Sequence, residues 1–269
     1  MIEEHVKRSI ELVRNLETDK IYNLGFSGGK DSVVLLDIAK RAGVKFEAVY
    51  SNTTIDPPGT IPFIRENYPE VKIVNPRESF LQLVARKGLP SRQRRFCCEI
   101  LKENYGIGKR NLEGMRRDES NNRAGYEPEQ CDSRKSMKGA CHVLPLVFWT
   151  ERQIWEYIHK HNLPYMKYYD PPYNFTRHGS VGCPLATKQQ MRIEFKTFPR
   201  YAINLIKAIK KFMETHPETF WGKNFDNGHE AFYYYINDLS LQDFKFMKTA
   251  SMFKNDFEIM VNNYLGIHE

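Results

Sequence analysis

One hexapeptide constrains the fold more than any other part of the chain, because it lies between a strand pattern and a helix pattern. The apolar run at residues 21–26 precedes Ser27-Gly28-Gly29-Lys30-Asp31-Ser32, and an apolar-periodic run at residues 33–39 follows it. Two glycines permit a tight turn that directs several backbone N–H groups toward one point. The following helix N-terminus adds partial positive charge, and Lys30 adds a full one. The sequence therefore predicts an anion site in which the Ser27 and Ser32 hydroxyls donate to phosphate oxygens.

The pattern after this turn alternates between strands and helices. It predicts strands at 21–26, 46–50, 71–74, 110–115 and 142–147, with helices between most of them, as at 79–87 and 151–161. Such alternation favours an α/β fold, an open and mostly parallel Rossmann-like sheet with helices on both faces. After about residue 185 the pattern is helical only. We predict a nucleotide-binding α/β domain at residues 1–186 and an all-helical C-terminal region at residues 187–269.

Composition and charge narrow the class of protein. No stretch of the chain approaches 18 consecutive apolar residues, so we expect no membrane-spanning helix and no membrane partner. The acidic, polar first residues do not resemble a signal peptide, which predicts a cytoplasmic protein. The net charge of +7 and the basic run at residues 92–95 suit a polyanion such as tRNA or DNA, although ATP is itself a polyanion. We also expect a homo-oligomer.

A second motif, residues 114–123, carries two arginines seven residues apart. Arg116 and Arg123 flank Ser120, and an arginine presents a rigid fork of donors that matches phosphate or sulfate oxygens. Read by itself, the segment is equally a charged surface loop. In an open parallel sheet, however, the loops that follow the strands gather at one edge. We therefore predict that the loops at 27–32, 51–59 and 116–123 converge on one crevice, and that the aperiodic residues 116–139 form a mobile loop.

These motifs resemble known ones. The hexapeptide resembles the PP-loop of the adenine nucleotide α-hydrolase superfamily, which holds the pyrophosphate part of ATP. The arginine segment resembles the Gly-x-Arg…Ser-x-x-Arg segment of the phosphoadenosine phosphosulfate (PAPS) reductase family, where it binds anionic groups of the nucleotide substrate. The segments at 144–158 and 162–170, with Trp149-Thr150 and Tyr168-Tyr169-Asp170, are similar to that family too. The resemblance spans roughly residues 20–186.

The five cysteines are Cys97, Cys98, Cys131, Cys141 and Cys183. An odd count with an adjacent pair argues against a disulfide framework and favours metal binding or thiol chemistry. In the related adenosine 5′-phosphosulfate (APS) reductases, a Cys-Cys pair and a distant Cys-x-x-Cys together ligate a [4Fe–4S] cluster. By this resemblance Cys97, Cys98 and Cys183 are candidate metal ligands, and Ser180 replaces the expected fourth.

Because such clusters are usually held by four thiolates, the substitution leaves three interpretations open. They are a serine-ligated or labile iron–sulfur cluster, a zinc site that recruits Cys131, Cys141 or His142, and a metal-free pocket. The simpler interpretation of Cys131 and Cys141 is a pair of unligated cysteines. His142 is then an ordinary strand residue.

Two departures from the reductase pattern favour ATP over PAPS. The family's nucleophilic cysteine lies in a terminal Glu-Cys-Gly-Leu-His, whereas this sequence has Leu265 at that position and no cysteine after Cys183. The Ser-Gly-Gly-Lys-Asp-Ser form is typical of the superfamily's ATP-using members. The resemblance thus implies an enzyme that cleaves ATP between its α- and β-phosphates and adenylylates an acceptor, in sulfur metabolism or sulfur insertion.

The same resemblance assigns roles within the site. Lys30 and Mg²⁺ would hold the leaving pyrophosphate, Asp31 would bind Mg²⁺ or cap the helix, and the arginines would hold the acceptor or the α-phosphate. The predicted catalytic residues are Lys30, Asp31, Arg116 and Arg123. The predicted nucleotide contacts are Ser27, Gly28, Gly29, Lys30, Asp31, Ser32, Asn52, Thr53, Asp56 and Ser120.

Two other functions remain open at the level of the sequence. One is a sulfonucleotide reductase with a non-standard electron route. The other is a nucleic-acid-binding component of a DNA or tRNA modification or defence system. The basic excess, the helical C-terminal region and residues 92–95 motivate the second alternative.

Overall fold

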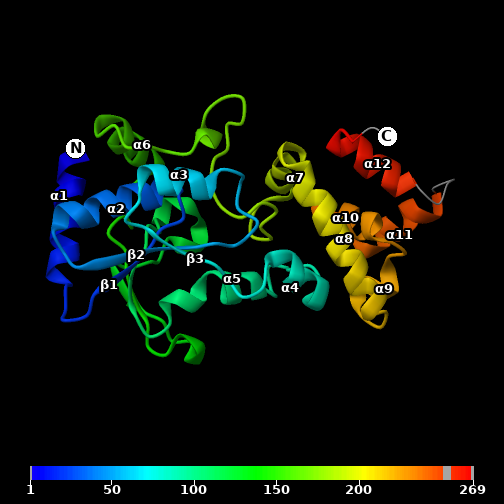
Figure 1. Ribbon diagram of the computed structural model, residues 1–269, viewed down its shortest axis with the longest axis horizontal. Helices are drawn as coiled ribbons and strands as arrows, with labels where there is room; N and C mark the ends of the chain where they lie inside the picture. The colour runs from blue at the N-terminus through cyan, green and yellow to red at the C-terminus, as the bar shows by residue number, and fades with distance from the viewer. Residues whose placement is uncertain (1, 251–255, 268–269) are drawn as a thin grey trace. The chain divides into compact units, whose positions relative to one another are not determined.

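The computed structural model describes residues 2–250 and 256–267, and the chain divides into two compact units (Figure 1). Unit 1 comprises residues 1–52, 58–76 and 101–179, and unit 2 comprises residues 53–57, 77–100 and 180–269. This division differs from the predicted boundary at residue 186, because residues 53–57 and 77–100 group with the C-terminal helices. Helix α4 (Phe80–Lys87), for example, packs against α8 (Pro199–Thr215) of the same unit.

Unit 1 contains a sheet of six strands in the order β3-β2-β1-β4-β6-β5. The strands are β1 (Tyr22–Gly25), β2 (Phe46–Ser51), β3 (Lys72–Val74), β4 (Arg110–Leu112), β5 (Glu129–Cys131) and β6 (Cys141–Val143). All neighbouring pairs run parallel except β5 with β6. The predicted α/β fold with a mostly parallel sheet is confirmed. The order reverses direction at β1, and in such sheets a ligand crevice opens at the carboxyl end of the strand where this happens.

The helices of unit 1 cover this sheet with apolar faces. Helices α1 (Ile2–Asn15), α2 (Lys30–Ala42) and α6 (Glu151–Lys160) pack against one another, and α3 (Thr60–Asn67) connects β2 to β3 (Figure 1). The side chains of Val34, Leu35 and Ile38 in α2 are fully buried. Burial of this kind contributes roughly 1.5–3 kcal/mol for each aliphatic side chain. The packing fixes the start of α2, and with it the glycine turn, against β1.

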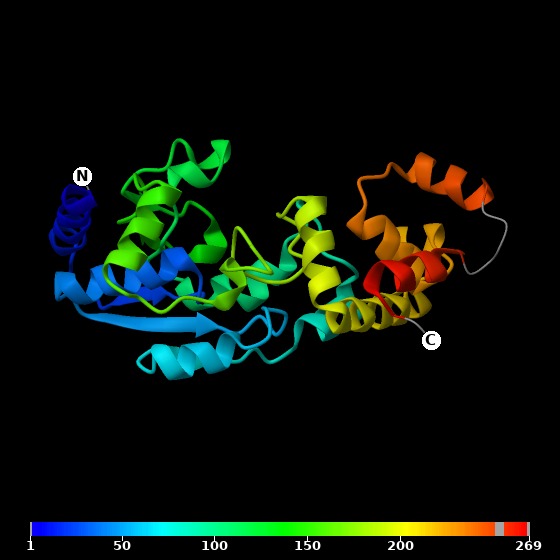
Figure 2. The same ribbon diagram turned by 90° about the horizontal axis from the view of Figure 1, so that it is seen from above.

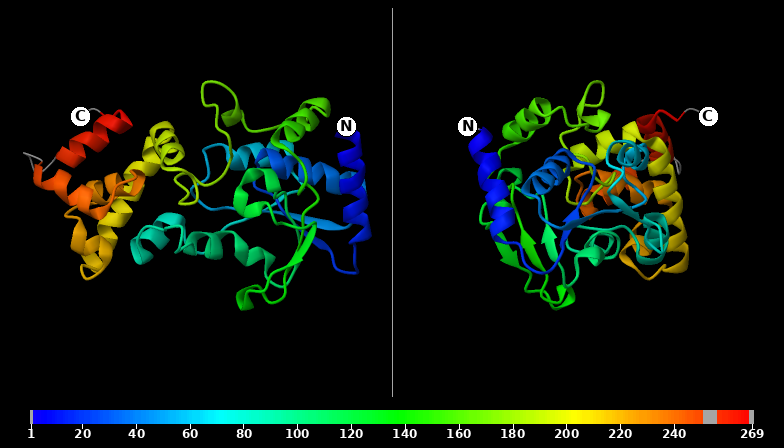
Figure 3. Two further views of the ribbon diagram at one scale, coloured as in Figure 1. Left: turned by 180° about the vertical axis from the view of Figure 1, so that it is seen from behind. Right: turned by 60° about the vertical axis from the view of Figure 1, so that its left-hand side comes forward.

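The stretch predicted as a mobile loop, residues 116–139, contains regular structure. It forms the 3₁₀ turns η2 (Arg117–Glu119), η3 (Asn121–Arg123) and η4 (Lys135–Met137), and it supplies β5, which pairs antiparallel with β6 (Figure 3, green). Strand β5, Glu129-Gln130-Cys131, is mostly polar and lacks the apolar run that indicated the other strands, which explains the error. Two further turns, η1 (Glu103–Gly106) and η5 (Lys167–Tyr169), complete the unit.

Unit 2 is helical. Its helices are α4, α5 (Phe96–Leu101, whose last residue belongs to unit 1), α7 (Lys188–Thr197), α8, α9 (Phe220–Asn224), α10 (Gly228–Ile236), α11 (Leu241–Ala250) and α12 (Asp256–Leu265). The predicted helical C-terminal part is therefore confirmed. Helix α10 packs against α7, α8 and α12, and Figure 2 shows α7 and α8 in yellow. The predicted helical region also includes residues 251–255, which lie outside the described residues.

Among the described residues, no helix is both long and apolar enough to cross a membrane.

Candidate functional site

The glycine turn has the geometry that the sequence predicts. Gly28 has a φ of +77°, in the left-handed region that side chains with a Cβ rarely adopt, and Gly29 is the N-cap of α2. The two serines close the turn: Ser27 Oγ accepts from Gly29 N at 3.2 Å and donates to Ser32 Oγ at 3.2 Å. Ser32 is buried and donates to the Gly29 carbonyl at 2.8 Å. The Ser32 hydroxyl therefore helps to close the turn, and its donation to a phosphate oxygen stays a prediction.

Lys30 is buried, with 4% of its surface exposed, and its charge is compensated. Its Nζ donates to the Thr176 carbonyl at 2.9 Å and lies 3.4 Å from a Glu151 oxygen and 3.7 Å from an Asp31 oxygen. Its backbone N–H donates to the Tyr169 hydroxyl at 3.0 Å. Burial raises the pKa of Tyr169, which keeps this hydroxyl protonated. Residues 169–176 thus contact the same amide and ammonium groups that a phosphate would use.

Arg116 and Asp31 form the second part of the site. Arg116 is 2% exposed, and its Nε donates to Asp31 Oδ1 at 2.6 Å. Its Nη1 donates to Asp118 Oδ2 at 3.2 Å, and its backbone N–H donates to Glu119 Oε1 at 2.9 Å. Burial acts to lower the pKa of Arg116, but the pairing with Asp31 and its neighbours outweighs this and raises the pKa. The arginine is therefore permanently charged and fixed in orientation.

The remaining predicted residues of unit 1 lie in the segment that follows Arg116 or just after the carboxyl end of β2. Arg123 pairs with Glu119, which also bonds the Arg116 amide, so the two arginines share a carboxylate. Ser120 is exposed, and its carbonyl accepts from the Arg123 amide at 2.9 Å. Asn52 follows β2 and donates from Nδ2 to Asn75 Oδ1 at 2.9 Å. Lys30, Asp31, Arg116 and Arg123 are thus linked through shared partners.

Thr53 and Asp56 belong to unit 2, where they meet Ser180. The Ser180 hydroxyl lies 3.1 Å from Asp56 Oδ1 and 3.2 Å from Thr53 Oγ1. The neighbouring Val181 amide donates to the Ile55 carbonyl at 2.9 Å, which ties the two segments together. These contacts place Ser180 in a hydrogen-bonded junction with a carboxylate. They account for Ser180 without a metal.

The structure groups the three free cysteines within unit 2. Cys97 forms a hydrogen bond with Cys98. This bond, burial and the electrostatic effect of Cys183 raise the pKa of Cys97. The hydroxyl of the buried Tyr235 donates to the Gly182 carbonyl at 3.2 Å. Burial raises the pKa of Tyr235, and the electrostatic effects of Cys183 and Cys97 raise it further. The grouping agrees with the predicted association of the three residues.

The donor set does not fit a four-ligand metal centre. Within residues 2–250 and 256–267, no three His, Cys, Asp or Glu side chains are arranged to hold a metal ion. Ser180, the expected fourth ligand, bonds Asp56 and Thr53 instead. We derive no metal-dependent step from these cysteines.

Similarity to known proteins identifies the family. The sequence model of the phosphoadenosine phosphosulfate reductase domain matches residues 21–189, which is more than half of the chain. The chain belongs to the phosphoadenosine phosphosulfate reductase family. The match includes the PP-loop, both arginines and the three free cysteines. The resemblance seen in the sequence motifs is thereby confirmed.

The similar proteins include adenosine 5′-phosphosulfate reductases and uncharacterized proteins. The chain is 31% identical to the adenosine 5′-phosphosulfate reductase of Staphylococcus haemolyticus, over 61% of this chain and 68% of that protein. It is 32% identical to that of Shouchella clausii, over 65% of this chain and 75% of that protein. An uncharacterized protein of Methanocaldococcus jannaschii is 27% identical over 80% of this chain. The chain spans about half the length of this and a second M. jannaschii relative, 47% and 54%.

A solved structure of the PAPS reductase from Candida auris, a phosphate complex, is 18% identical with a TM-score of 0.49 and covers 66% of this chain and 93% of that one. The U34-tRNA thiolase NcsA from Methanococcus maripaludis with its [4Fe–4S] cluster is 16% identical with a TM-score of 0.44, covering 94% of this chain and 83% of that one.

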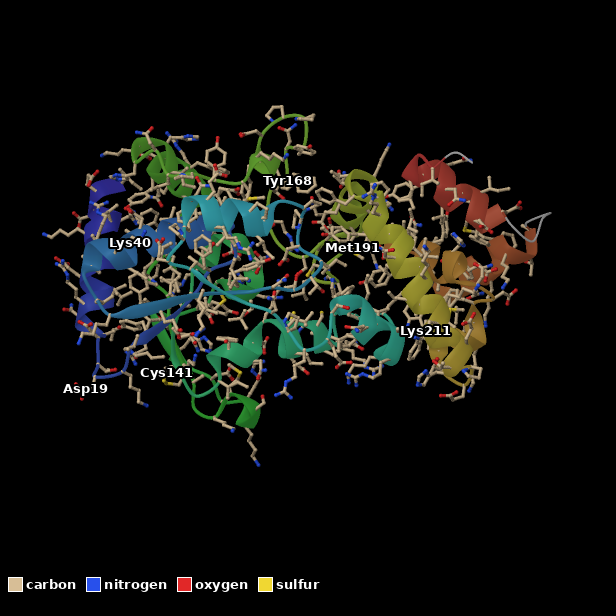
Figure 4. The ribbon with its side chains drawn as sticks, viewed as in Figure 1. Asp19, Lys40, Cys141, Tyr168, Met191 and Lys211 are labelled. Atoms are coloured by element: carbon tan, nitrogen blue, oxygen red, sulfur yellow. A yellow bond between two sulfur atoms is a disulfide. The ribbon has the colours of Figure 1, made fainter. Side chains whose placement is uncertain are left out.

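The other two cysteines correct a sequence prediction. Cys131 and Cys141 form a disulfide across β5 and β6, where they are paired in register (Figure 4 labels Cys141). The expectation of unligated cysteines is therefore wrong, as is their recruitment to a zinc site. The odd count and the adjacent Cys97-Cys98 pair argued against a disulfide framework, and neither reveals the strand pairing that brings Cys131 and Cys141 together. His142 lies in β6 as predicted, and a hydrogen bond with Glu113 at 3.0 Å raises its pKa.

Sequence reasoning also missed residues that complete the PP-loop site. Tyr169, Thr176 and Glu151 contact Lys30, and His178 approaches Gly28 and bonds Thr60 at 3.2 Å. The signal available was the Tyr168-Tyr169-Asp170 segment, which resembled the family but received no role. Residues about 120 or more positions from the loop cannot be assigned to it by local pattern.

Proposed function

We propose that the PP-loop of this family member binds the pyrophosphate part of ATP, and that the chain cleaves ATP between its α- and β-phosphates to adenylylate an acceptor. The observation that carries the proposal is the double-glycine turn at the start of α2, with the buried Lys30 ammonium beside it. Backbone N–H groups, a helix N-terminus and a fixed cation are the recurring elements of phosphate sites. Neutralising the leaving pyrophosphate is the main electrostatic task of such a reaction.

The proposed roles follow from the contacts. Lys30 would neutralise the phosphates, and Asp31 is the carboxylate that would hold Mg²⁺. Bound Mg²⁺ would supply further neutralisation of phosphate charge. Arg116 is enclosed and held by Asp31 and Asp118, so we assign it to positioning Asp31. Arg123, which is less buried, is the arginine that we assign to the acceptor or the α-phosphate.

Tyr169 would regulate access to this site. Its hydroxyl accepts from the Lys30 amide, which is one of the N–H groups that a phosphate oxygen would bond. Nucleotide binding would therefore exchange one hydrogen bond for another at this amide. The exchange is favourable because the phosphate oxygen is charged and forms the stronger bond, but binding still gives up the hydrogen bond to Tyr169.

The test is product formation from ATP labelled in its α-phosphate, with Mg²⁺ and a panel of acceptors that includes sulfate, carboxylic acids and tRNA. The proposal predicts labelled AMP or an adenylylated acceptor, together with pyrophosphate, for at least one acceptor. Lys30→Met, which keeps the length of the side chain and removes its charge, should abolish the product. Absence of both AMP and pyrophosphate with every acceptor would count against adenylylation.

A second candidate is a sulfonucleotide reductase, favoured by the two APS reductases that are 31% and 32% identical to the chain. Release of sulfite from APS or PAPS takes up two electrons, which an added dithiol would supply. The grouped thiols Cys97, Cys98 and Cys183 are the residues of this chain that a thiol-based electron route would use. Sulfite formed with dithiol, and lost in Cys183→Ser, would support this function. No sulfite from either nucleotide would exclude it.

A further inference from the structure

Unit 2 contains a cavity of about 980 Å³ that the proposed ATP site does not use. All of its walls come from unit 2: residues 89–94 after α4, residues 184–192 at the start of α7, Phe220 and Trp221 of α9, and residues 234–239 at the end of α10. The volume is in the range of sites that hold a nucleotide-sized ligand. We call it the α7–α9 cavity.

The walls of the α7–α9 cavity are strongly basic. Arg92, Arg94, Lys188 and Arg192 line it, and Asp238 is the acidic residue among the described lining residues. Segment 77–100, which supplies two of the arginines, carries six Arg and Lys residues and two Glu, a formal charge of 6 − 2 = +4. An unbalanced set of cations around a cavity attracts an anion.

Three of these cations, Arg92, Lys188 and Arg192, donate to neutral oxygens. Arg92 donates to the carbonyls of Pro184 at 3.3 Å and Ala186 at 3.5 Å, and Arg192 donates to Asn237 Oδ1 at 3.0 Å. Lys188 donates to the Tyr235 carbonyl, and its burial and the nearby Arg92 lower its pKa. Within residues 2–250 and 256–267, none of the four cations forms an ion pair with a carboxylate. The charge of the three arginines therefore remains available to a ligand, whereas Lys188 also interacts electrostatically with the Asp238 carboxylate.

Aromatic side chains stand beside the cations. Phe220 is 46% exposed, and Trp221 and Tyr234 are half-buried next to it. The ring centres of Phe220 lie 5.3 Å from Trp221 and 6.1 Å from Tyr234. An exposed ring beside arginines offers a stacking surface next to phosphate donors. Binding sites for single-stranded nucleic acids have this combination.

We propose that the α7–α9 cavity binds an unpaired nucleotide within a single-stranded nucleic acid, with phosphates on Arg92, Arg94 and Arg192 and the base against Phe220 and Trp221. An acidic peptide would use the cations but would leave the exposed aromatic surface without a planar partner. A paired base would present its edge rather than its face. The proposal does not depend on ATP cleavage, because every residue involved lies in unit 2.

The test is fluorescence anisotropy of labelled oligonucleotides of about 12 nucleotides, a length within the range that such sites cover. Single-stranded RNA, single-stranded DNA, the matching duplexes and AMP are compared at low salt, with the full chain. The proposal predicts that a single strand binds more tightly than its duplex and that AMP competes weakly. The better of the two single strands identifies the class of nucleic acid.

Three variants separate the cavity from general surface charge. Arg92→Ala combined with Arg94→Ala should weaken binding about tenfold or more, and Phe220→Leu about fivefold, since phosphate contacts and stacking contribute separately. The matched control is Lys211→Ala, an exposed cation of α8 that does not line the cavity (labelled in Figure 4) and should change binding less than twofold. ATP binding measured in the same variants shows whether unit 1 is intact.

The proposal is overturned by any of three results: no single-stranded binding at low salt, equal losses in the cavity variants and in Lys211→Ala, or no effect of Phe220→Leu. The last result would mean that the cavity holds a polyanion without reading a base. If the unaltered chain binds the oligonucleotide but does not cleave ATP, the proposed function is refuted and this proposal stands.

Discussion

The PP-loop of unit 1 and the α7–α9 cavity of unit 2 are both basic, but they hold their cations differently. Lys30 and Arg116 are almost fully buried and contact carboxylates of Asp31, Asp118 and Glu151. Arg92 and Arg192 bond carbonyl and amide oxygens instead. The first arrangement fixes the cations before a ligand arrives and leaves little net charge. The second leaves the charge uncompensated.

This difference teaches what each region is suited to bind. A pre-oriented, compensated pair suits a compact ligand whose few phosphate oxygens must be placed accurately for a reaction. An uncompensated group of cations beside aromatic rings suits a flexible polyanion, for which affinity comes largely from released counterions. The predictions below follow from this contrast, in order of decreasing effect.

The largest effect is expected from Lys30→Met. Removing a buried cation from the phosphate site should reduce AMP formation by on the order of 10²–10³-fold, the effect of losing one preorganised charge at a reacting group. The measurement is the rate of AMP release under saturating ATP. Lys40→Met is the matched control, because Lys40 lies on the same helix, is exposed and pairs with Glu70 (labelled in Figure 4). Similar losses in both variants would show that Lys30 has no special role.

The next largest effect is expected from salt, which should weaken ligand binding more at the α7–α9 cavity than at the PP-loop. If three cations of the cavity each hold one phosphate, a fourfold rise in salt should weaken oligonucleotide binding about twentyfold, since each contact contributes about 0.7 to the logarithmic slope. ATP binding should weaken by less than about fivefold, because the PP-loop cations are enclosed and paired. Titrations at a series of salt concentrations measure both slopes. Equal slopes would remove the contrast between the regions.

A smaller gain is expected from Tyr169→Phe. The change removes the hydroxyl that accepts from the Lys30 amide and keeps the ring. The centre of this ring lies 5.1 Å from the centre of the Trp155 ring. Freeing the amide should tighten ATP binding about threefold to tenfold, the usual net contribution of one hydrogen bond. Isothermal titration with ATP and Mg²⁺ measures this. Weaker binding would mean that the hydroxyl contacts the nucleotide rather than competing with it.

The smallest effect concerns pH. Burial, with a contribution from Arg92, lowers the pKa of Lys188 from its ordinary value of 10.5, and Asp238 opposes this. Above its pKa the side chain is neutral, so oligonucleotide affinity should fall as pH rises through a range where other lysines are still charged. Lys188→Arg should remove this fall, because arginine stays charged. A fall of the same size in Lys188→Arg would assign it to another group.

Much of unit 1 is predictable from sequence because its signals are local. The turn at residues 27–32 sits within a strand–turn–helix pattern, and its glycines and lysine are adjacent in the chain. The mostly parallel sheet follows from alternating apolar runs. Strand β5, by contrast, is mostly polar, and its pairing with β6 brings the disulfide partners Cys131 and Cys141 together. No apolar run in β5 indicates this pairing in the sequence.

The contacts that the sequence does not reveal come from distant segments. Tyr169 and Thr176 reach Lys30 across more than 130 positions, and the α7–α9 cavity takes its walls from four separate stretches of chain. Ser180 looks like a lost metal ligand by its spacing from Cys183, yet it bonds Asp56 and Thr53. Spacing along the chain identifies candidate residues, but tertiary packing decides which partners they contact.

The central claim is that the PP-loop holds the pyrophosphate part of ATP, and competition binding tests it most directly. ATP, APS, PAPS and inorganic pyrophosphate are titrated with Mg²⁺ against the protein and against Lys30→Met. We predict that ATP binds more tightly than APS or PAPS, that pyrophosphate displaces it, and that Lys30→Met loses both ligands together. Tighter binding of APS or PAPS than of ATP, with no displacement by pyrophosphate, would contradict the claim.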